Sequence, residues 1–445
     1  MFSLARSLEL GCTCLVLALP AVAQAPPQAP ALGTTVVPPD ATSIIVPSGE
    51  THLIDTDLTP LLVVQEVVVE AGGTLEAKGS NPVMLFARER VYLNGALRAD
   101  GEDAPDVSMP FSANFAAPGG AGGPFGAAGG VGSPNLTGST AVGSPGGHTF
   151  GLNGGGPGVS VFKSGVSWQQ RIAGSGGGGR FAADAPINGL PTAPENLGLV
   201  ALAGADGSAN AQSALTFAVP ALGGAPGIGV FEDTNPDNDF FGARWDPLTQ
   251  TVVAGELLLP MAGSGGGAGG DSIRENVFPQ IPWALQDEMR GAGGGGGGGL
   301  VMIATREFEV GPEGSLSVDG GAGGRGEQVD DSPSPGGPVA PPPLGPQASI
   351  GGCGGGGSGG MLMVQATRFD FSQAVGEALS ARGGAGGITG DAGVAVPAGG
   401  AGGPGLIQLH AWNAQSIVLP DGVSIDDLSA PNAKVLLPLA LPPLP

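Results

Sequence analysis

Four oxygen-bearing side chains at every second position between residues 233 and 239 are the clearest candidates for chemistry in this chain. Asp233, Asn235, Asp237 and Asp239 carry carboxylate and amide oxygens, which are the ligands that a hard cation such as Ca²⁺ prefers. The pattern therefore predicts a calcium site. A solvated acidic turn is the alternative, because Asn, Asp and Pro also favour turns for reasons of their own backbone and side-chain geometry.

The spacing of these four residues is similar to the first half of an EF-hand loop. It departs from that loop at two positions, since Asn238 stands where the loop has its turn glycine and Arg244 stands where it has the closing bidentate glutamate. Calcium at this segment is the single cofactor that the sequence suggests, and we expect no other.

Two further motif matches are explained by composition. Residues 266–274 match one nonapeptide of a calcium β-roll, but such rolls bind each ion between tandem copies and this chain has a single copy. Ser358 lies in a Gly-x-Ser-x-Gly pattern, which in a nucleophile elbow follows a strand and precedes a helix. Here polyglycine precedes it and an apolar run follows. We expect no catalytic residue at either place.

The histidines, and the one cysteine outside the predicted signal peptide (1–23), form no recognisable site. We call this residue, Cys353, the mature cysteine. His52, His148 and His410 are far apart and lack the clustered spacing of zinc ligands. His410 is expected to face outward from a strand. Cys353, in a run of glycines, is read either as a link between two chains or as a small residue tolerated in a loop.

The elements that must position any site are strands in a repeated unit. Residues 83–101 and 301–320 share one pattern: an apolar strand, a strand of alternating apolar and polar residues, a glycine turn and a second alternating strand. An offset of 22 residues within the first block aligns three apolar pairs, Val69 with Val91, Leu75 with Leu97 and Ala77 with Ala99. Their neighbours are polar, which is the period-2 pattern of strands with one buried face. Repetition of this kind predicts stacked coils.

Later copies extend the prediction toward the carboxyl end. Phe308, Val310, Leu316 and Val318 form one expected inner face, and Phe369, Phe371, Leu379 and Ala381 form another. Accordingly, Leu316→Asp should unfold the coils and Ser317→Asp should be nearly neutral. Gly73, Gly95 and Gly314 share one slot, where the tight turn is expected to need positive φ, and Gly376 departs from that slot by one residue.

Composition alone does not decide whether the chain outside these strands is ordered or disordered. Glycine supplies 86 and proline 42 of the 445 residues, about 29%, a share typical of low-complexity chains. Yet 41% of residues are apolar and only 12% are charged, unlike disordered chains. Identical Gly-Gly-Ala-Gly-Gly stretches begin at residues 119, 320, 383 and 399, and residues 266–270 repeat the same five letters. They are read either as flexible loops or as places where backbones approach closely.

Charge and the amino-terminal segment bear on partners and location. A net charge of −23, from 39 acidic and 16 basic side chains, opposes binding to nucleic acid and to anionic membranes. Arg6, the apolar run from Leu10 to Leu19 and the small residues before Gln24 predict a signal peptide. We expect a secreted, extracellular or cell-surface protein, with the periplasm as the alternative, and no transmembrane segment after signal removal.

These patterns divide the chain into six parts. They are a signal peptide (1–23), a Pro-rich leader (24–42), first coils (43–101), a Gly-rich insertion with a small β subdomain and the acidic loop (102–298), later coils (299–428) and an apolar Pro-rich tail (429–445). The predicted fold class is all-β, with parallel β-helix or solenoid-like coils interrupted by long Gly/Pro-rich loops and by that one large insertion.

The coils in 43–101, 299–324, 360–387 and 405–424 resemble those of Gly-rich secreted bacterial proteins with parallel β-helix architecture, of the haemagglutinin or pectin-lyase type. The resemblance implies a structural or adhesin-like surface role, with cell-surface or matrix components, polysaccharide among them, as partners. It carries over no catalytic residue. A polysaccharide lyase or hydrolase on the same scaffold is one alternative. Arg88, Arg90 and Arg98, which share a block with Glu89 and Asp100, are then its strongest feature, although solvated strand faces give the same pattern. A largely disordered Gly-rich matrix protein is the other alternative.

Overall fold

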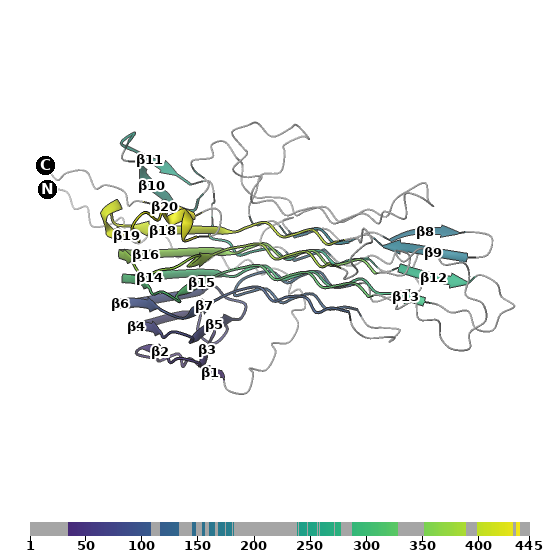
Figure 1. Ribbon diagram of the computed structural model, residues 1–445, viewed down its shortest axis with the longest axis horizontal. Helices are drawn as coiled ribbons and strands as arrows, with labels where there is room; N and C mark the ends of the chain where they lie inside the picture. Colours follow the sequence, from purple (N-terminus) through teal and green to yellow (C-terminus); the bar gives the residue numbers. More distant parts are fainter. Residues whose placement is uncertain are drawn as a thin grey trace, which may run out of the picture.

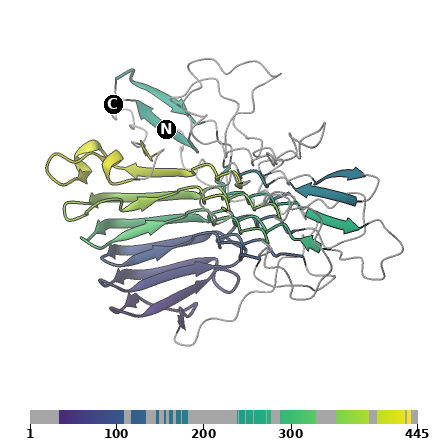
Figure 2. The ribbon, with the colours of Figure 1, turned by 45° about the vertical axis from the view of Figure 1, so that its right-hand side comes forward.

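The computed structural model is built of strands with almost no helix, and it has two parallel sheets at one end and glycine-rich segments extending from them (Figures 1 and 2). The structure describes residues 34–107, 116–132, 145–147, 154–155, 160–164, 168–173, 175–179, 181, 238, 240–246, 248–255, 257, 259–270, 272–276, 287–327, 351–388, 398–429 and 433–436. The all-β prediction is confirmed in this part of the chain. The described strands do not close into a complete coil.

Two sheets of parallel strands face each other. The smaller has the order β1 (Thr34–Val36), β3 (Thr51–Asp55), β5 (Thr74–Lys78), β7 (Ala96–Arg98), β15 (Ser315–Ser317), β17 (Leu379–Ser380). The larger has the order β2 (Ile44–Val46), β4 (Leu61–Val69), β6 (Val83–Leu93), β14 (Leu300–Val310), β16 (Met361–Asp370), β18 (Leu406–Ala411), β20 (Ala433–Leu436), with β19 (Ile417–Val418) beside β16. From β1 to β7, and again from β14 to β18, the chain passes alternately from one sheet to the other.

The predicted repeat is visible in the strand register. Val83 pairs with Val301 and Leu97 pairs with Leu316, although about two hundred residues separate the partners in sequence. In the smaller sheet the 22-residue offset is confirmed, because Leu75 pairs with Leu97. In the larger sheet it is wrong: Val69 pairs with Leu93 instead of Val91. The offset differs between the sheets because the turn after β6, residues 94–95, is two residues shorter than the turn after β4, residues 70–73. A register shift between Val64 and Glu66, where β6 holds an extra residue, changes the offset within the larger sheet as well.

Apolar side chains fill the space between the sheets. The expected inner positions of both sheets belong to one buried cluster, in which Leu75, Leu97 and Leu316 are fully inaccessible to solvent. Three phenylalanines lie at its centre, with ring centroids 6.0 Å apart for Phe308 and Phe369 and 6.1 Å apart for each of these with Phe371. The alternation of buried and exposed residues along these strands is therefore confirmed. Burial of these side chains is the main stabilising term here.

The glycine-rich segments form an ordered lattice built from backbone alone, which we call the glycine lattice. The segment 291–299 shows its plan. Its N–H groups donate to three neighbouring segments, 352–358, 127–130 and 99–102, and its carbonyls accept from three more, 263–269, 120–123 and 321–324. Each segment at the centre of the lattice thus has six neighbours. In this part of the protein hydrogen bonds between backbones replace the side-chain core.

The lattice repeats every three residues. Ala292, Gly295 and Gly298 all donate to one neighbour, at Gly352, Gly355 and Ser358, with N···O distances of 2.9–3.0 Å. Gly294, Gly296 and Gly297, which lie between them, donate to the other two neighbours. Three residues per turn is the geometry of a polyproline II helix, which has no hydrogen bonds of its own. Its backbone groups must therefore find partners in other segments when they are buried.

Close approach explains why glycine is needed in the lattice. A Cβ atom added to Gly354 would lie 1.8 Å from the carbonyl oxygen of Gly293, and one added to Gly295 would lie 2.0 Å from that of Gly321. Real Cβ atoms do not approach backbone that closely. Of the two interpretations of the Gly-Gly-Ala-Gly-Gly stretches, close backbone packing is confirmed, and these stretches are not loops.

The shared glycine slot of the strand repeat needs glycine for the same reason, so the prediction of positive φ is wrong there. Added Cβ atoms at Gly73, Gly95 and Gly314 would lie 2.8, 2.3 and 2.1 Å from backbone carbonyl oxygens, and none of the three has positive φ. Positive φ occurs instead at Gly72 (74°) and at Gly376 (67°). Gly376 is thus a turn glycine of another kind.

The remaining elements are small. An antiparallel sheet with the order β13 (Asp287–Met289), β12 (Ser272–Asn276), β9 (Trp168–Ala173), β8 (Ser160–Ser164) lies at the end of the glycine lattice that is far from the parallel sheets (Figure 1). The antiparallel pair β10 (Ala243–Asp246) and β11 (Thr251–Ala254) lies near β18 and β20. Two single-turn 3₁₀ helices, η5 (Ala414–Ser416) and η6 (Ile425–Asp427), follow β18. No helix in the described part is long and apolar enough to cross a membrane.

Candidate functional site

The predicted calcium ligands Asp233, Asn235, Asp237 and Asp239 lie outside the described residues. Calcium binding there stays a prediction. Within the described part of the chain, no group of three or more His, Cys, Asp or Glu side chains is placed to hold a metal ion.

The residues of the nucleophile-elbow pattern and the mature cysteine are parts of the glycine lattice. Ser358 is fully buried, and its Oγ accepts a hydrogen bond of 2.8 Å from the backbone N–H of Ser264. The backbone N–H of Cys353 donates to Oγ of Ser175 at 3.1 Å, and the Cys353 side chain is also fully buried. A buried thiol cannot reach a second chain, so the interpretation of Cys353 as an interchain link is wrong for this fold.

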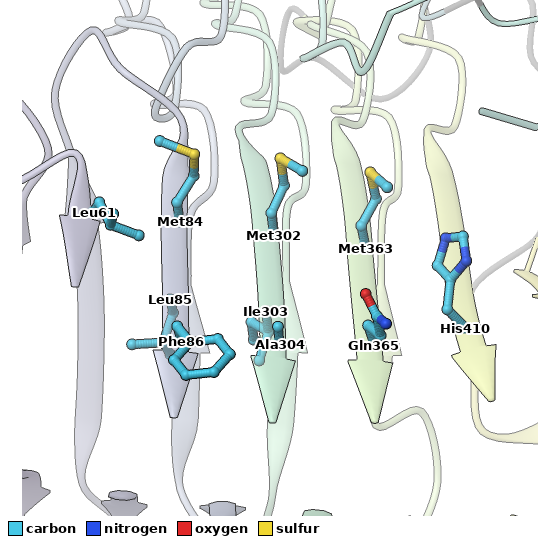
Figure 3. Close-up of a pocket in the computed structure, with 10 residues that line it drawn as sticks. All are labelled: Leu61, Met84, Leu85, Phe86, Met302, Ile303, Ala304, Met363, Gln365 and His410. Carbon is cyan, nitrogen blue, oxygen red and sulfur yellow. The ribbon is translucent and has the colours of Figure 1, made fainter. Parts of the chain in front are cut away.

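The outer face of the larger sheet is hollowed across its strands. Because the strands are parallel and in register, equivalent side chains form rows perpendicular to them. One row contains Leu61, Met84, Met302 and Met363 on β4, β6, β14 and β16. They line a hollow of about 290 Å³ and point to the same side of the sheet (Figure 3). We call this hollow the apolar half of the cross-strand groove.

The next two rows form the polar half of the cross-strand groove, a hollow of about 560 Å³. Phe86, Ala304, Gln365 and His410 pair in register across β6, β14, β16 and β18. Two residues further along the strands lie Arg88, Arg306, Thr367 and Trp412. Phe86 and Trp412 are 45% and 67% exposed, so each presents much of its ring to solvent. Aromatic side chains so exposed at the two ends of a hollow are typical of ligand sites.

The charges around the cross-strand groove are uneven. Arg90, one row beyond, pairs with Glu66 at 3.0 Å, and Arg368 pairs with Asp370 at 2.6 Å. Arg88 and Arg306 form no ion pair with any residue that the structure describes. Among the described residues, no carboxylate lines either half of the groove. The groove is thus locally positive in a chain whose net charge is −23.

One edge of the groove is fixed by Gln408. Its side chain is fully buried, and it accepts from the N–H of Phe241 at 2.7 Å and donates to the carbonyl of Phe241 at 3.2 Å. This pair of hydrogen bonds holds the segment before β10 against β18. The Nε2 atoms of Gln408 and His410 are 3.2 Å apart. His410 faces outward from its strand, as expected from sequence, but it is only partly exposed. Burial lowers the pKa of His410, which is therefore neutral at pH 7.

Sequence reasoning missed the cross-strand groove because each strand face was read by itself. Taken alone, the position of Arg88 is equally well explained by a solvated strand face. A signal was present: Met84 and Met302 occupy the same slot of the repeat, and both lie on the outer face of the sheet. An apolar side chain repeated on an outer face indicates a continuous surface feature.

Comparison of the chain with protein-family models, with curated protein sequences and with solved structures finds no match. The function is therefore inferred from the geometry of the described residues.

Proposed function

We propose that this protein is a secreted structural or adhesin-like surface protein that binds its partner without transforming it. The observation that carries the proposal is the cross-strand groove, which combines exposed aromatic rings with positive charge and has no carboxylate in its described lining. A glycoside hydrolase needs two carboxyl groups flanking its substrate. A groove of this composition supports binding better than hydrolysis.

The sheets and the glycine lattice support a scaffold role. We propose that the two parallel sheets are faces of β-solenoid coils. The chain alternates between them, and each return adds a strand beside its predecessor. Segments at the lattice centre are buried and bonded on all sides. Such a backbone has few alternative conformations, which favours a rigid extracellular support over a disordered matrix.

The experiment compares binding with turnover. The mature chain (24–445), labelled with a fluorophore, is incubated with cells of the producing organism and with a panel of immobilised extracellular polysaccharides. The proposal predicts saturable binding to the cell surface and no release of reducing or unsaturated sugar ends. Release of such ends would favour the carbohydrate-active enzyme. Absence of surface binding, with rapid proteolysis along the whole chain, would favour the disordered matrix protein.

The calcium prediction has a separate test. Thermal unfolding of the same chain is followed by far-UV circular dichroism, once with EGTA and once with millimolar Ca²⁺. Ligands at Asp233, Asn235, Asp237 and Asp239 predict a higher transition temperature with Ca²⁺, lost in Asp233→Ala/Asp237→Ala. An unchanged transition would leave the acidic-turn interpretation.

A further inference from the structure

Arg88 and Arg306, which form no ion pair with any described residue, lie side by side at the β6–β14 end of the polar half of the cross-strand groove. Thr305 pairs with Ala87 and Glu307 pairs with Arg90, so the register shift between them sets Arg306 opposite Arg88 and Glu89. Glu89 accepts a hydrogen bond from the side chain of Gln65 on β4, which neighbours β6 on the side away from β14. Like charges on neighbouring strands are unfavourable unless something compensates them. A bound anion would do so.

The surroundings of the two arginines specify more than a simple anion. Phe86 lies two residues before Arg88 on β6, and Trp412 lies at the other end of the arginine row, just after β18, about three strand spacings, or about 14 Å, away. Between these two aromatic residues, the groove is lined by the small side chain of Ala304 and by the exposed polar side chains of Gln365 and Thr367. Aromatic faces attract C–H groups, while amide and hydroxyl groups bind hydroxyls. A row of sugar rings presents both.

An extended peptide fits this groove less well. The groove runs across β6, β14, β16 and β18, each of which is already paired on both sides. No backbone edge is available for a peptide to add as a strand. The ligand must therefore be recognised by side chains alone.

We propose that the polar half of the cross-strand groove binds a polysaccharide strand bearing carboxylate or sulfate groups. Arg88 and Arg306 receive one anionic group between them, and Phe86 and Trp412 stack on the flanking sugars. Guanidinium groups suit this task because they hold planar oxyanions through two hydrogen bonds. This inference names a ligand class for the proposed function. It rests on that function, because a secreted surface protein would meet extracellular polysaccharides.

The test uses the full mature chain on sensor surfaces coated with polygalacturonate, dextran sulfate or neutral dextran. Wild type should bind one or both charged polymers at least about tenfold more tightly than dextran, and binding should weaken with salt. The two charged surfaces distinguish carboxylate from sulfate. Arg88→Gln/Arg306→Gln should lose about tenfold in affinity, and Trp412→Ala about fivefold.

The matched control is Arg98→Gln/Arg382→Gln, which removes the same charge beside the smaller sheet and should bind within about twofold of wild type. All substituted side chains are exposed, and an unchanged melting temperature shows that each variant folds. Equal loss in both double variants would overturn the groove assignment. Equal binding to dextran, or equally tight binding to poly-glutamate, would overturn the acidic-sugar assignment. Cell-surface binding that persists when no acidic polysaccharide binds would overturn this inference while the proposed function stands.

Discussion

The parallel sheets and the glycine lattice are two ways of burying a polypeptide in one molecule. Between the sheets, side chains such as Leu316 and Phe369 fill the interior and the backbone hydrogen-bonds along each sheet. In the lattice, almost no side chains are present, and the backbone bonds in three directions around each segment. The core between the sheets should therefore tolerate substitutions by apolar side chains of similar volume. The centre of the lattice should not tolerate an added side-chain atom.

The largest expected effect comes from a charge in the sheet core. Leu316→Asp buries a carboxylate among apolar side chains without a partner, and should lower the free energy of unfolding by about 4 kcal/mol or more. The measurement is denaturant unfolding of the purified variant. Ser317 is not a neutral control as predicted from sequence, because its Oγ donates to Asp100 at 2.9 Å and an aspartate there would face that carboxylate. Ser315→Asp is the better control, and a loss equal to that of Leu316→Asp would contradict the core assignment.

A single methyl group should break the lattice. Gly354→Ala sets a Cβ 1.8 Å from the carbonyl oxygen of Gly293, and backbone packed on all sides cannot move away. We expect a loss of about 3 kcal/mol by thermal unfolding. The reverse change at a position that already holds a methyl group, Ala292→Gly, should cost about 1 kcal/mol or less. Equal, small effects of both changes would mean that the segments are not closely packed.

The lattice surface should be less sensitive than its centre. Asp100, Asp103 and Asp106 accept from the backbone N–H groups of Asp319, Ala322 and Arg325, at 2.7, 2.6 and 2.8 Å. Asp103→Ala removes one of these bonds at a site that water can reach, which should cost about 1 kcal/mol. Urea unfolding measures it. A loss as large as that of Gly354→Ala would contradict the distinction between surface and centre.

The smallest expected effect is a change in how the free energy of unfolding depends on pH. Burial raises the pKa of Asp100 above its ordinary value of 3.8, outweighing the hydrogen bond from the Asp319 backbone. A raised folded-state pKa means that Asp100 contributes stability below pH 3.8, which is lost as the pH rises through the folded value. Asp100→Asn should therefore gain stability relative to wild type between pH 4 and pH 7. Asp421→Asn, an exposed site, changes the charge equally and should show no such gain. Parallel curves for wild type and Asp100→Asn would contradict this.

The sheets could be predicted from sequence because their signal is local. Alternation at residues 308–318 follows from the two faces of a strand, and the repeat aligns Val83 with Val301 across the insertion. The lattice could not be predicted in the same way, because glycine has no side chain to reveal which face is buried. Its traces in the sequence are the Gly-Gly-Ala-Gly-Gly stretches, which left close packing and flexible loops as equal interpretations, and the three-residue spacing of Asp100, Asp103 and Asp106. The cross-strand groove needs the register of β6, β14, β16 and β18, which the shift at Arg88 and Glu89 changes.

Amide hydrogen exchange at residues 291–299 tests the central claim, that glycine backbones form a bonded core, most directly. Ala292 and Gly294–Gly299 each donate to a neighbouring segment. The account predicts that these amides exchange as slowly as those of β14, which follows them in the chain. Exchange at the rate of an unstructured peptide, with β14 still protected, would contradict it.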